Sequence, residues 1–391
     1  MTAHTILVIG AGIGGLTTAL AFARQGFAVD VVEQATTLSE VGAGLQVSPN
    51  ASRILVALGL GEALQRTMVL PRDIALASGR SLRAIARVPC GGFAADRWGA
   101  PYGVMHRADL QALLLEAVIA HPACRVHLEQ PVQSSDITTL HARIGTPRPD
   151  LIVAADGVWS QSRKLIPQAS MPRFSGQVAW RFQLDASAAG SVIDTRNVTA
   201  FLGARTHLVA YPLENGTVLN MVAIAGGKNL GESWAAQEAA ADRTELLQAF
   251  AGWDPRLVSL LRTAPRMTRW PLFAVADGRW SDDAGMVMIG DAAHAMTPFA
   301  AQGAAMAIED GYELAHACGH AGKDFSSAIE RYETHRRSRL TQVRRRGAFN
   351  RFAYHASGPV RLGRDLVLGL RKPESLAADL DWLYGYRATG L

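Results

Sequence analysis

The first residues of the chain carry its clearest chemical signal. Gly10, Gly12 and Gly15 have the G-x-G-x-x-G spacing, follow a predicted strand (5–9), and precede a helix that begins near Ile13. In this arrangement the first glycine permits a tight turn, the second lets the backbone approach a pyrophosphate, and the third allows close helix–strand packing. The helix N-terminus then offers N–H groups and a positive dipole end to phosphate.

An acidic residue stands where such a site needs one. Glu33 follows a second predicted strand (28–32), 18 residues after Gly15, and its carboxylate can accept hydrogen bonds from a ribose. Gly14 in the turn and Gln34 beside the acid are assigned to the same site. The alternative is an ordinary βαβ unit with a glycine-rich turn, and the common register of turn, helix and acid favours the binding site.

A second set of residues lies far along the chain. Asp291 follows a predicted strand (285–290), where its carboxylate can accept a hydrogen bond or cap the next helix. The segment 300–307 consists almost entirely of small residues, so its backbone can lie against a flat ring. A helix predicted to begin near Gly303 would point its positive end, with Ala304, at that ring, although tight packing against a core is the alternative.

Length and composition describe a globular protein of several units. With 391 residues, 49% apolar and 19% charged, we expect two to three domains, or one core with a large insertion. No run approaches 18 apolar residues, so no membrane span is expected. Cys90, Cys124 and Cys318 are scattered, which argues against disulfides and a zinc site and is typical of the cytoplasm. No metal is therefore expected.

The net charge of +5 is unevenly distributed. Residues 331–372 contain 12 Lys and Arg against Glu333 and Asp365, which gives +10, so the rest of the chain carries −5. A nucleic-acid or anionic-membrane patch is one interpretation. No nucleic-acid motif or aromatic interleaving accompanies the charge, so we favour a solvated helix face and predict no nucleic-acid partner.

The predicted elements divide the chain into dispersed pieces. Alternating strands and turns between 174 and 224, including Asn215–Gly216, indicate an antiparallel sheet. Short strands and loops are expected over 71–100, a glycine-containing loop over 41–50, and a helix over 233–250. The cofactor motifs lie before, between and after these segments, which favours a large cofactor held by several parts of the chain.

Three motifs in order resemble one known family. They are GAGIGG (10–15), Asp156-Gly157 with Arg163, and GDAAHAMTPFAAQGAAMAIED (290–310). With HRADL (106–110) and VAWR (178–181), they are similar to FAD-dependent aromatic hydroxylases of the p-hydroxybenzoate-hydroxylase type. Three further segments, GAGLQVSPN (42–50), HLVAYP (207–212) and DWLYGY (381–386), look like those of salicylate hydroxylases, 3-hydroxybenzoate 6-hydroxylases and 6-hydroxynicotinate 3-monooxygenases.

The resemblance implies an α/β fold with a Rossmann-like FAD-binding domain and an inserted antiparallel-sheet substrate domain. The FAD-binding domain would comprise 1–70, 101–170 and 276–330, the substrate domain 71–100 and 171–275, and C-terminal helices 331–391. NADH or NADPH would reduce FAD while binding transiently, and a flavin C4a-hydroperoxide formed with dioxygen would hydroxylate a small phenolic or hydroxybenzoate-like aromatic. Attack at the carboxyl-bearing carbon of a salicylate-like substrate would also release carbon dioxide.

Cofactor roles follow by the same resemblance. Asp291 would contact the ribityl chain and Arg107 the flavin, although Arg107 could instead pair with Asp109. Asp156 would touch FAD and the nicotinamide donor, or simply form a structural turn. His294 is expected to pack or cap rather than act as a base.

Substrate residues are expected on the inner face of the antiparallel sheet. Tyr211 and His207 are the catalytic candidates, and Arg181 and Asn220 the accompanying contacts. A lone histidine on a strand is more often a structural residue, which is the alternative for His207. Phe299 would line the pocket or pack in the core. Gln46 stands where 6-hydroxynicotinate enzymes have histidine, and Val198 where they have cysteine, so the sequence departs from that substrate and favours the 3-hydroxybenzoate branch.

Two other classes of function share these cofactor motifs. One is an FAD-dependent reductase without oxygen transfer, and the other is a flavin-binding redox sensor. Intact cofactor motifs argue against the sensor, and slow flavin reoxidation would favour the reductase. We expect a cytoplasmic monomer or homodimer.

Overall fold

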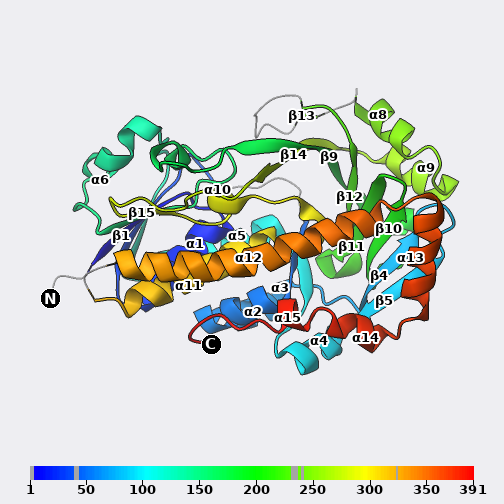
Figure 1. Cartoon of the computed structure of the whole chain (residues 1–391), viewed down its shortest axis with the longest axis horizontal. Helices are drawn as coiled ribbons and strands as arrows, with labels where there is room; N and C mark the ends of the chain where they lie inside the picture. Colours follow the sequence, from blue (N-terminus) through cyan, green and yellow to red (C-terminus); the bar gives the residue numbers. More distant parts are fainter. Residues whose placement is uncertain (1–3, 39–43, 230–236, 239–241, 323–324) are drawn as a thin grey trace.

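The computed structural model describes residues 4–38, 44–229, 237–238, 242–322 and 325–391. A five-stranded parallel sheet and an eight-stranded, mostly antiparallel sheet lie toward opposite ends of the molecule (Figure 1). The long helix α12 (Ser326–Tyr354) runs across both regions. The predicted class, an α/β fold with a parallel sheet, a separate antiparallel sheet and C-terminal helices, is confirmed.

The parallel sheet has the order β15-β8-β1-β2-β7, and all its pairings are parallel. Its central strand is apolar and buried throughout residues 6–9, as expected for a strand covered on both faces. Helix α1 packs against α5 and α11. These elements are β1 (Thr5–Ile9), α1 (Ile13–Arg24), β2 (Ala28–Val32), α5 (Arg107–Ala120), β7 (Cys124–His127), β8 (Leu151–Ala154), β15 (Met286–Met288) and α11 (Gly303–Gly319).

The second sheet has the order β13-β14-β9-β12-β11-β10-β4-β5, and only β10 and β4 pair in parallel. Directly opposed residues share a face, so Tyr211 and Asn220 lie together, as do Val209 and Val222. The strands are β4 (Asp73–Ser78), β5 (Ala84–Pro89), β9 (Pro172–Asp185), β10 (Val198–Gly203), β11 (Thr206–Leu213), β12 (Val218–Gly226), β13 (Gln237–Glu238) and β14 (Thr268–Val275).

The two faces of this sheet have different partners. Leu208, Trp180 and Met221 belong to a buried cluster with residues of α8 (Asp242–Ala249) and α9 (Pro255–Thr263). Tyr211, on the other face, belongs to the main core that surrounds the parallel sheet. The Tyr211 face therefore lies toward the core of the parallel-sheet region, away from α8 and α9.

Shorter elements connect these layers. They are β3 (Gly44–Val47), α2 (Pro49–Leu55), a π-helical turn (Val56–Leu60), α3 (Gly61–Thr67), α4 (Gly91–Trp98), β6 (Gly103–His106), a 3-10 turn (Ser134–Thr139), α6 (Leu140–Arg143), a 3-10 turn (Ser162–Leu165), α7 (Ala186–Ala189), a 3-10 turn (Glu214–Gly216), α10 (Asp291–His294), η5 (Pro298–Ala300), α13 (Gly358–Leu370), α14 (Pro373–Ala378) and α15 (Asp381–Tyr384).

Several local expectations differ from the structure. Residues 91–98 form a helix where short strands and loops were expected, and residues 44–47 form a strand inside the expected loop 41–50. Of the helix expected over 233–250, residues 233–236 and 239–241 lie outside the described residues, and 237–238 pair as a strand with β14. Tertiary contacts override local propensity in these segments.

The basic C-terminal region is only partly a solvated face. Arg336 and Arg339 of α12 are 1% and 4% exposed and pair with Glu309 and Asp310 of α11. Arg344 pairs with an acid outside the region, Asp277. The acidic excess elsewhere in the chain therefore neutralises part of the basic excess within the fold.

Candidate functional site

The glycine-rich turn joins β1 to α1 and leaves open space beside it. Gly10 has φ +101°, which favours glycine, and a Cβ added at Gly15 would lie 1.9 Å from the Gly10 carbonyl oxygen. A Cβ added at Gly12 would meet no atom of the described residues within 4 Å. Gly12 also caps α1 without any side-chain hydrogen bond. The first helical N–H groups are therefore available for an anionic ligand.

A second helix begins at the same edge. A Cβ added at Gly14 would lie 3.1 Å from the Ala307 Cβ, and one added at Gly311 would lie 2.3 Å from the Thr18 hydroxyl oxygen. Helices α1 and α11 are therefore in close contact and run in the same direction. Helix α11 also begins without a side-chain cap. Space is open beside Gly303, and Ala304 is half-buried. Two positive helix ends converge here, an arrangement suited to a dinucleotide with an electron-rich ring.

Glu33 braces the glycine-rich turn. Its Oε2 accepts from the Ala11 N–H at 2.8 Å, and its Oε1 accepts from the Ala35 N–H at 3.0 Å. Each carboxylate oxygen has further lone-pair sites, so these bonds leave room for ribose hydroxyl donors. Gln34 is exposed beside it.

Asp291 is exposed at the start of α10, immediately after β15 and Gly290. Two buried groups fix this corner. Arg163 donates to the carbonyl oxygens of Asp291 and Ala292 at 3.0 and 2.8 Å. Asp310 accepts from the Gly290 N–H at 2.9 Å. The backbone that carries the exposed Asp291 carboxylate is thus fixed by hydrogen bonds to both Arg163 and Asp310.

His294 forms a buried pair with Asp310, with 2.5 Å between Nε2 and Oδ2. Burial alone would raise the pKa of Asp310, but His294 and Arg336 hold it well below its usual range. The geometry agrees with a packing role for the histidine, because its ring is engaged inside the protein.

Asp156 forms a local turn. Its Oδ2 accepts from the N–H groups of Gln161 and Ser162 at 2.9 and 3.1 Å. Its Oδ1 is buried with no hydrogen-bond partner among the described residues. Arg107 is half-buried at the first position of α5, and Gln111 of the same helix donates to the Ala11 carbonyl oxygen at 2.9 Å. Helix α5 thus contacts the glycine-rich turn.

On the antiparallel sheet, Tyr211 and Asn220 lie side by side and are 3% and 1% exposed. The Gly44 N–H donates to Asn220 Oδ1 at 3.0 Å, while Asn220 Nδ2 is buried without a partner among the described residues. A Cβ added at Gly44 would lie 2.9 Å from the Tyr211 hydroxyl oxygen. Burial raises the pKa of Tyr211, and the Arg181 guanidinium opposes that rise.

His207 shares this face and is 2% exposed. Its ring centroid lies 5.1 Å from that of Phe299, in the turn that leads to α11, and its Nδ1 is 2.9 Å from His355 Nε2. Burial and His355 lower the pKa of His207 well below 6.5. The histidine is therefore neutral at neutral pH.

The remaining predicted substrate residues border this face. Gln46 Oε1 accepts from the Tyr102 hydroxyl at 2.6 Å. The Arg181 guanidinium lies 5.5 Å from the centre of the Trp270 ring. The structure thus brings Tyr211, Asn220 and His207 together on one buried face, with Arg181 on a neighbouring strand.

Two features were missed by sequence reasoning. His355, at the end of α12, carries no local signal. A buried amide network at the start of α11 was also missed: Asn50 Nδ2 donates to Gln302 Oε1 at 3.1 Å and to Glu309 Oε1 at 2.7 Å. Gln302 and Glu309, both within the motif 290–310, were the available signal for this network.

The turn, the acid after the second strand and the two uncapped helix ends define a dinucleotide-binding flavoprotein. The residues fit FAD, because the open space at Gly12 and Gly303 lies beside unsatisfied helix N-termini. A family model described as "FAD binding domain" matches residues 3–347, and the chain belongs to this family. Relatives that match its whole length are named hydroxylases and monooxygenases, so it is an FAD-dependent monooxygenase.

Known proteins support that assignment along the whole chain. The sequence is 34% identical to 3-hydroxybenzoate 6-hydroxylase 1 of Aquipseudomonas alcaligenes, covering 98% of each chain. It is 36% identical to a 3-amino-4-hydroxybenzoate 2-monooxygenase of Streptomyces platensis, covering 98% of this chain and 96% of that protein. The fold matches a variant of Klebsiella pneumoniae HpxO complexed with FAD, with TM-score 0.82, 22% identity and coverage of 97% and 98%.

Two kinds of feature are absent from the described residues. No helix among them is long and apolar enough to cross a membrane. Nor do three or more of their His, Cys, Asp and Glu side chains gather in a way that could hold a metal ion.

The open space at Gly12 gives a first prediction. Gly12→Ala should leave the apoprotein folded but weaken FAD binding by about tenfold, within the 1–3 kcal/mol that an added methyl group costs in a filled space. Gly92→Ala is the control, because its added Cβ also meets no atom within 4 Å, and it lies in α4. Flavin fluorescence titration and thermal unfolding measure the two effects. Equal FAD affinity in both variants would contradict the assigned position of the pyrophosphate.

Proposed function

We propose that this monooxygenase hydroxylates a small phenolic or hydroxybenzoate-like aromatic with dioxygen and NADH or NADPH. The observation that carries the proposal is the buried Asn220 Nδ2, which has no partner among the described residues, next to the buried Tyr211 side chain. A buried polar atom without a partner costs free energy unless a ligand satisfies it. A substrate bearing a hydroxyl or carboxylate in an apolar surrounding would do so. The relatives named for hydroxybenzoates support the same class.

We propose the following roles for the cofactor residues. Gly10, Gly12, Gly14 and Gly15 give the backbone access to the pyrophosphate, and Glu33, flanked by Gln34, accepts from the adenosine ribose. Asp291 accepts from the ribityl chain, Arg107 and Asp156 lie beside the cofactor, and Gly303 and Ala304 present the positive end of α11 to the ring. When bound, FAD supplies the redox and oxygen-activating chemistry.

On the substrate side, Tyr211 and Asn220 orient the ring through its polar substituents, and Arg181, Gln46 and Phe299 border the substrate. His207 is neutral and can accept the phenolic proton, which makes the ring more nucleophilic. The buried apolar surroundings exclude water from the reacting centre. The nicotinamide donor would bind transiently. We further propose a cytoplasmic monomer or homodimer, consistent with three buried, free cysteines.

The test of the proposed function is a panel of hydroxybenzoates and hydroxypyridines. The expected result is accelerated NAD(P)H oxidation, with hydroxylated product formed in preference to hydrogen peroxide. Stimulated oxidation that yields only peroxide with every compound would contradict the proposal, since the substrate would not be hydroxylated.

Tyr211→Phe tests the contact residue itself. Loss of one hydrogen bond between neutral groups costs about 0.5–1.5 kcal/mol, so kcat/KM should fall by about 2- to 13-fold while FAD binding is unchanged. The measurement is steady-state kinetics with the best panel compound, together with the ratio of product to peroxide. Wild-type kinetics and coupling would reduce Tyr211 to a packing residue.

A further inference from the structure

His207 has one nitrogen that the proposed function does not use. Nε2 is the nitrogen that would accept the substrate proton. The other nitrogen, Nδ1, lies 2.9 Å from His355 Nε2. The neighbouring side chain is an imidazole with two nitrogens, and it too lacks charge at neutral pH: burial and Arg351 lower the pKa of His355 to about 4. Two neutral imidazoles in hydrogen-bond contact can pass a proton from one ring to the next.

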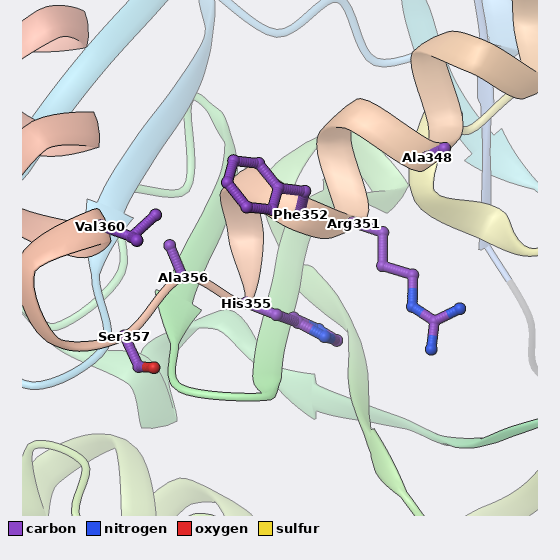
Figure 2. A pocket seen from close by; sticks show the side chains of 7 residues that line it. All are labelled: Ala348, Arg351, Phe352, His355, Ala356, Ser357 and Val360. Carbon is purple, nitrogen blue, oxygen red and sulfur yellow. The ribbon is translucent and has the colours of Figure 1, made fainter.

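His355 connects the buried face with the outside of the molecule. It lines a surface groove at the junction of α12 and α13, together with Arg351, Phe352, Ser357 and Val360. Figure 2 shows His355 and Arg351 extending from the end of α12, with strands of the antiparallel sheet behind them. His207 is 2% exposed, so His355 stands between a buried imidazole and groove water.

Backbone contacts fix the pair. The Arg205 N–H, in the turn before β11, donates to the His355 carbonyl oxygen at 3.3 Å. The rings of Phe299 and Tyr354 lie 5.1 and 5.5 Å from that of His207. The histidine pair is therefore enclosed by η5, β11 and the end of α12.

We propose that His355 is the outer member of a two-imidazole proton path between His207 and the groove. This inference rests on the proposed function, in which a phenolic proton leaves through His207. As the substrate O–H bond breaks, an N–H bond forms at His207 Nε2. The Nδ1 proton of His207 moves to Nε2 of His355, and the Nδ1 proton of His355 moves to water. Protonation of the product oxygen by the reverse sequence restores both tautomers, so the path consumes no proton.

The same contact makes His355 a positioning residue. With His207 Nδ1 donating to His355, Nε2 of His207 carries a lone pair and can accept. If His355 instead donated the hydrogen bond to His207 Nδ1, Nε2 of His207 would carry hydrogen and could not act as a base.

The charged and titratable groups around the pair are Arg351 and Tyr354 on α12, Arg205 before β11, and Arg364 on α13, whose Nη1 donates to the Ala353 carbonyl oxygen. No acid of the described residues ion-pairs with either histidine, which favours neutral rings.

The first experiment follows ionisation of a bound phenol without turnover. The FAD-loaded enzyme is mixed anaerobically, without NAD(P)H, with the panel compound that it hydroxylates best, and phenolate absorbance is recorded by stopped flow. His355→Gln preserves a hydrogen-bonding amide beside His207 but cannot relay a proton. We expect ionisation to be slower by about tenfold or more, since a general base contributes about 10²- to 10⁴-fold, and substrate affinity to be unchanged. Added imidazole should restore part of the rate.

The control and the His207 variant separate the two proposals. His320→Gln removes one member of another histidine pair, at the end of α11, whose rings are 4.4 Å apart, and it should behave as wild type. Slow ionisation in His207→Gln with a wild-type rate in His355→Gln would overturn the path and leave the base in place. A wild-type rate in His207→Gln would overturn both the base and the path.

A measurement without substrate tests the neutral pair. The pKa values of His207 and His355 are lower in the folded state than their unfolded value of 6.5. At any pH between the folded and unfolded values, the unfolded chain therefore binds more protons than the folded protein. Their stabilising contribution is complete above about 6.5 and is lost as the pH falls toward about 4. Wild type should lose thermal stability over this range more steeply than His355→Gln, with His320→Gln matching wild type. If thermal stability falls equally steeply with pH in wild type and in His355→Gln, the two histidines are not a neutral pair, and the proposed path is overturned.

Discussion

Arg336→Met is expected to lower the free energy of unfolding of the apoprotein by about 3–5 kcal/mol, the usual cost of breaking a buried ion pair. Arg336 is 1% exposed, and it donates to Asp310 Oδ1 at 2.7 Å and Glu309 Oε2 at 2.6 Å. Both acids are 0% exposed. Methionine would fill the volume but leave two buried carboxylates with fewer partners.

Urea unfolding followed by circular dichroism measures this effect, provided that the slope with denaturant is unchanged. Arg345→Met is the matched control, because Arg345 is an exposed residue of the same helix and should change stability by no more than about 0.5 kcal/mol. Similar midpoints for the two variants would show that Arg339 and His294 satisfy the acids without Arg336.

Glu33→Ala is expected to weaken FAD binding by about 2–3 kcal/mol, or roughly 30- to 160-fold, through loss of charge-assisted hydrogen bonds to the ribose. The variant also removes the acceptor of the Ala11 N–H, so part of the loss arises from a looser glycine-rich turn. Equilibrium titration of the apoprotein with FAD measures the affinity.

Glu33→Gln separates these two contributions. It keeps one acceptor oxygen for the turn but removes the charge, so it should retain the apoprotein's thermal stability and still bind FAD more weakly than wild type. Wild-type FAD affinity in Glu33→Ala would exclude the ribose contact. If Glu33→Gln binds FAD with wild-type affinity and Glu33→Ala does not, FAD binding depends on the hydrogen bond to the glycine-rich turn rather than on the charge.

The sequence predicts the parts of the fold that are determined locally. The first strand, the turn at Gly10 and helix α1 follow one another within 20 residues, and turn chemistry and apolar pattern both specify them. Helix α4 was missed because Gly91 and Gly92 indicate a loop. Distant contacts hold it instead: the Trp98 indole N–H donates to Asp381 at 2.8 Å, and its ring lies 4.9 Å from that of Tyr384.

Predictions for the functional site likewise fail where segments distant in the sequence meet. Alternation along β11 correctly predicts that His207 and Tyr211 share a face, because side-chain direction in a strand has period two. No pattern within a segment could have paired His207 with His355, which is 148 residues away. The amide network of Asn50, Gln302 and Glu309 likewise depends on how α2 and α11 pack, and it is visible only in three dimensions.

Helix α12 contacts both halves of the molecule at points that are far apart along its axis. Arg336 binds α11, Asn350 Nδ2 donates to the Phe299 carbonyl oxygen at 2.9 Å, and His355 reaches β11 just beyond its last residue. With 29 residues the helix is about 43 Å long, and each residue turns it by about 100°. The length and rotational phase of α12 therefore contribute to the alignment of the two sheets. Removing one residue between Arg336 and Asn350 would turn the far end by more than a quarter of a circle, so this stretch tolerates substitutions on its exposed side but not changes in length.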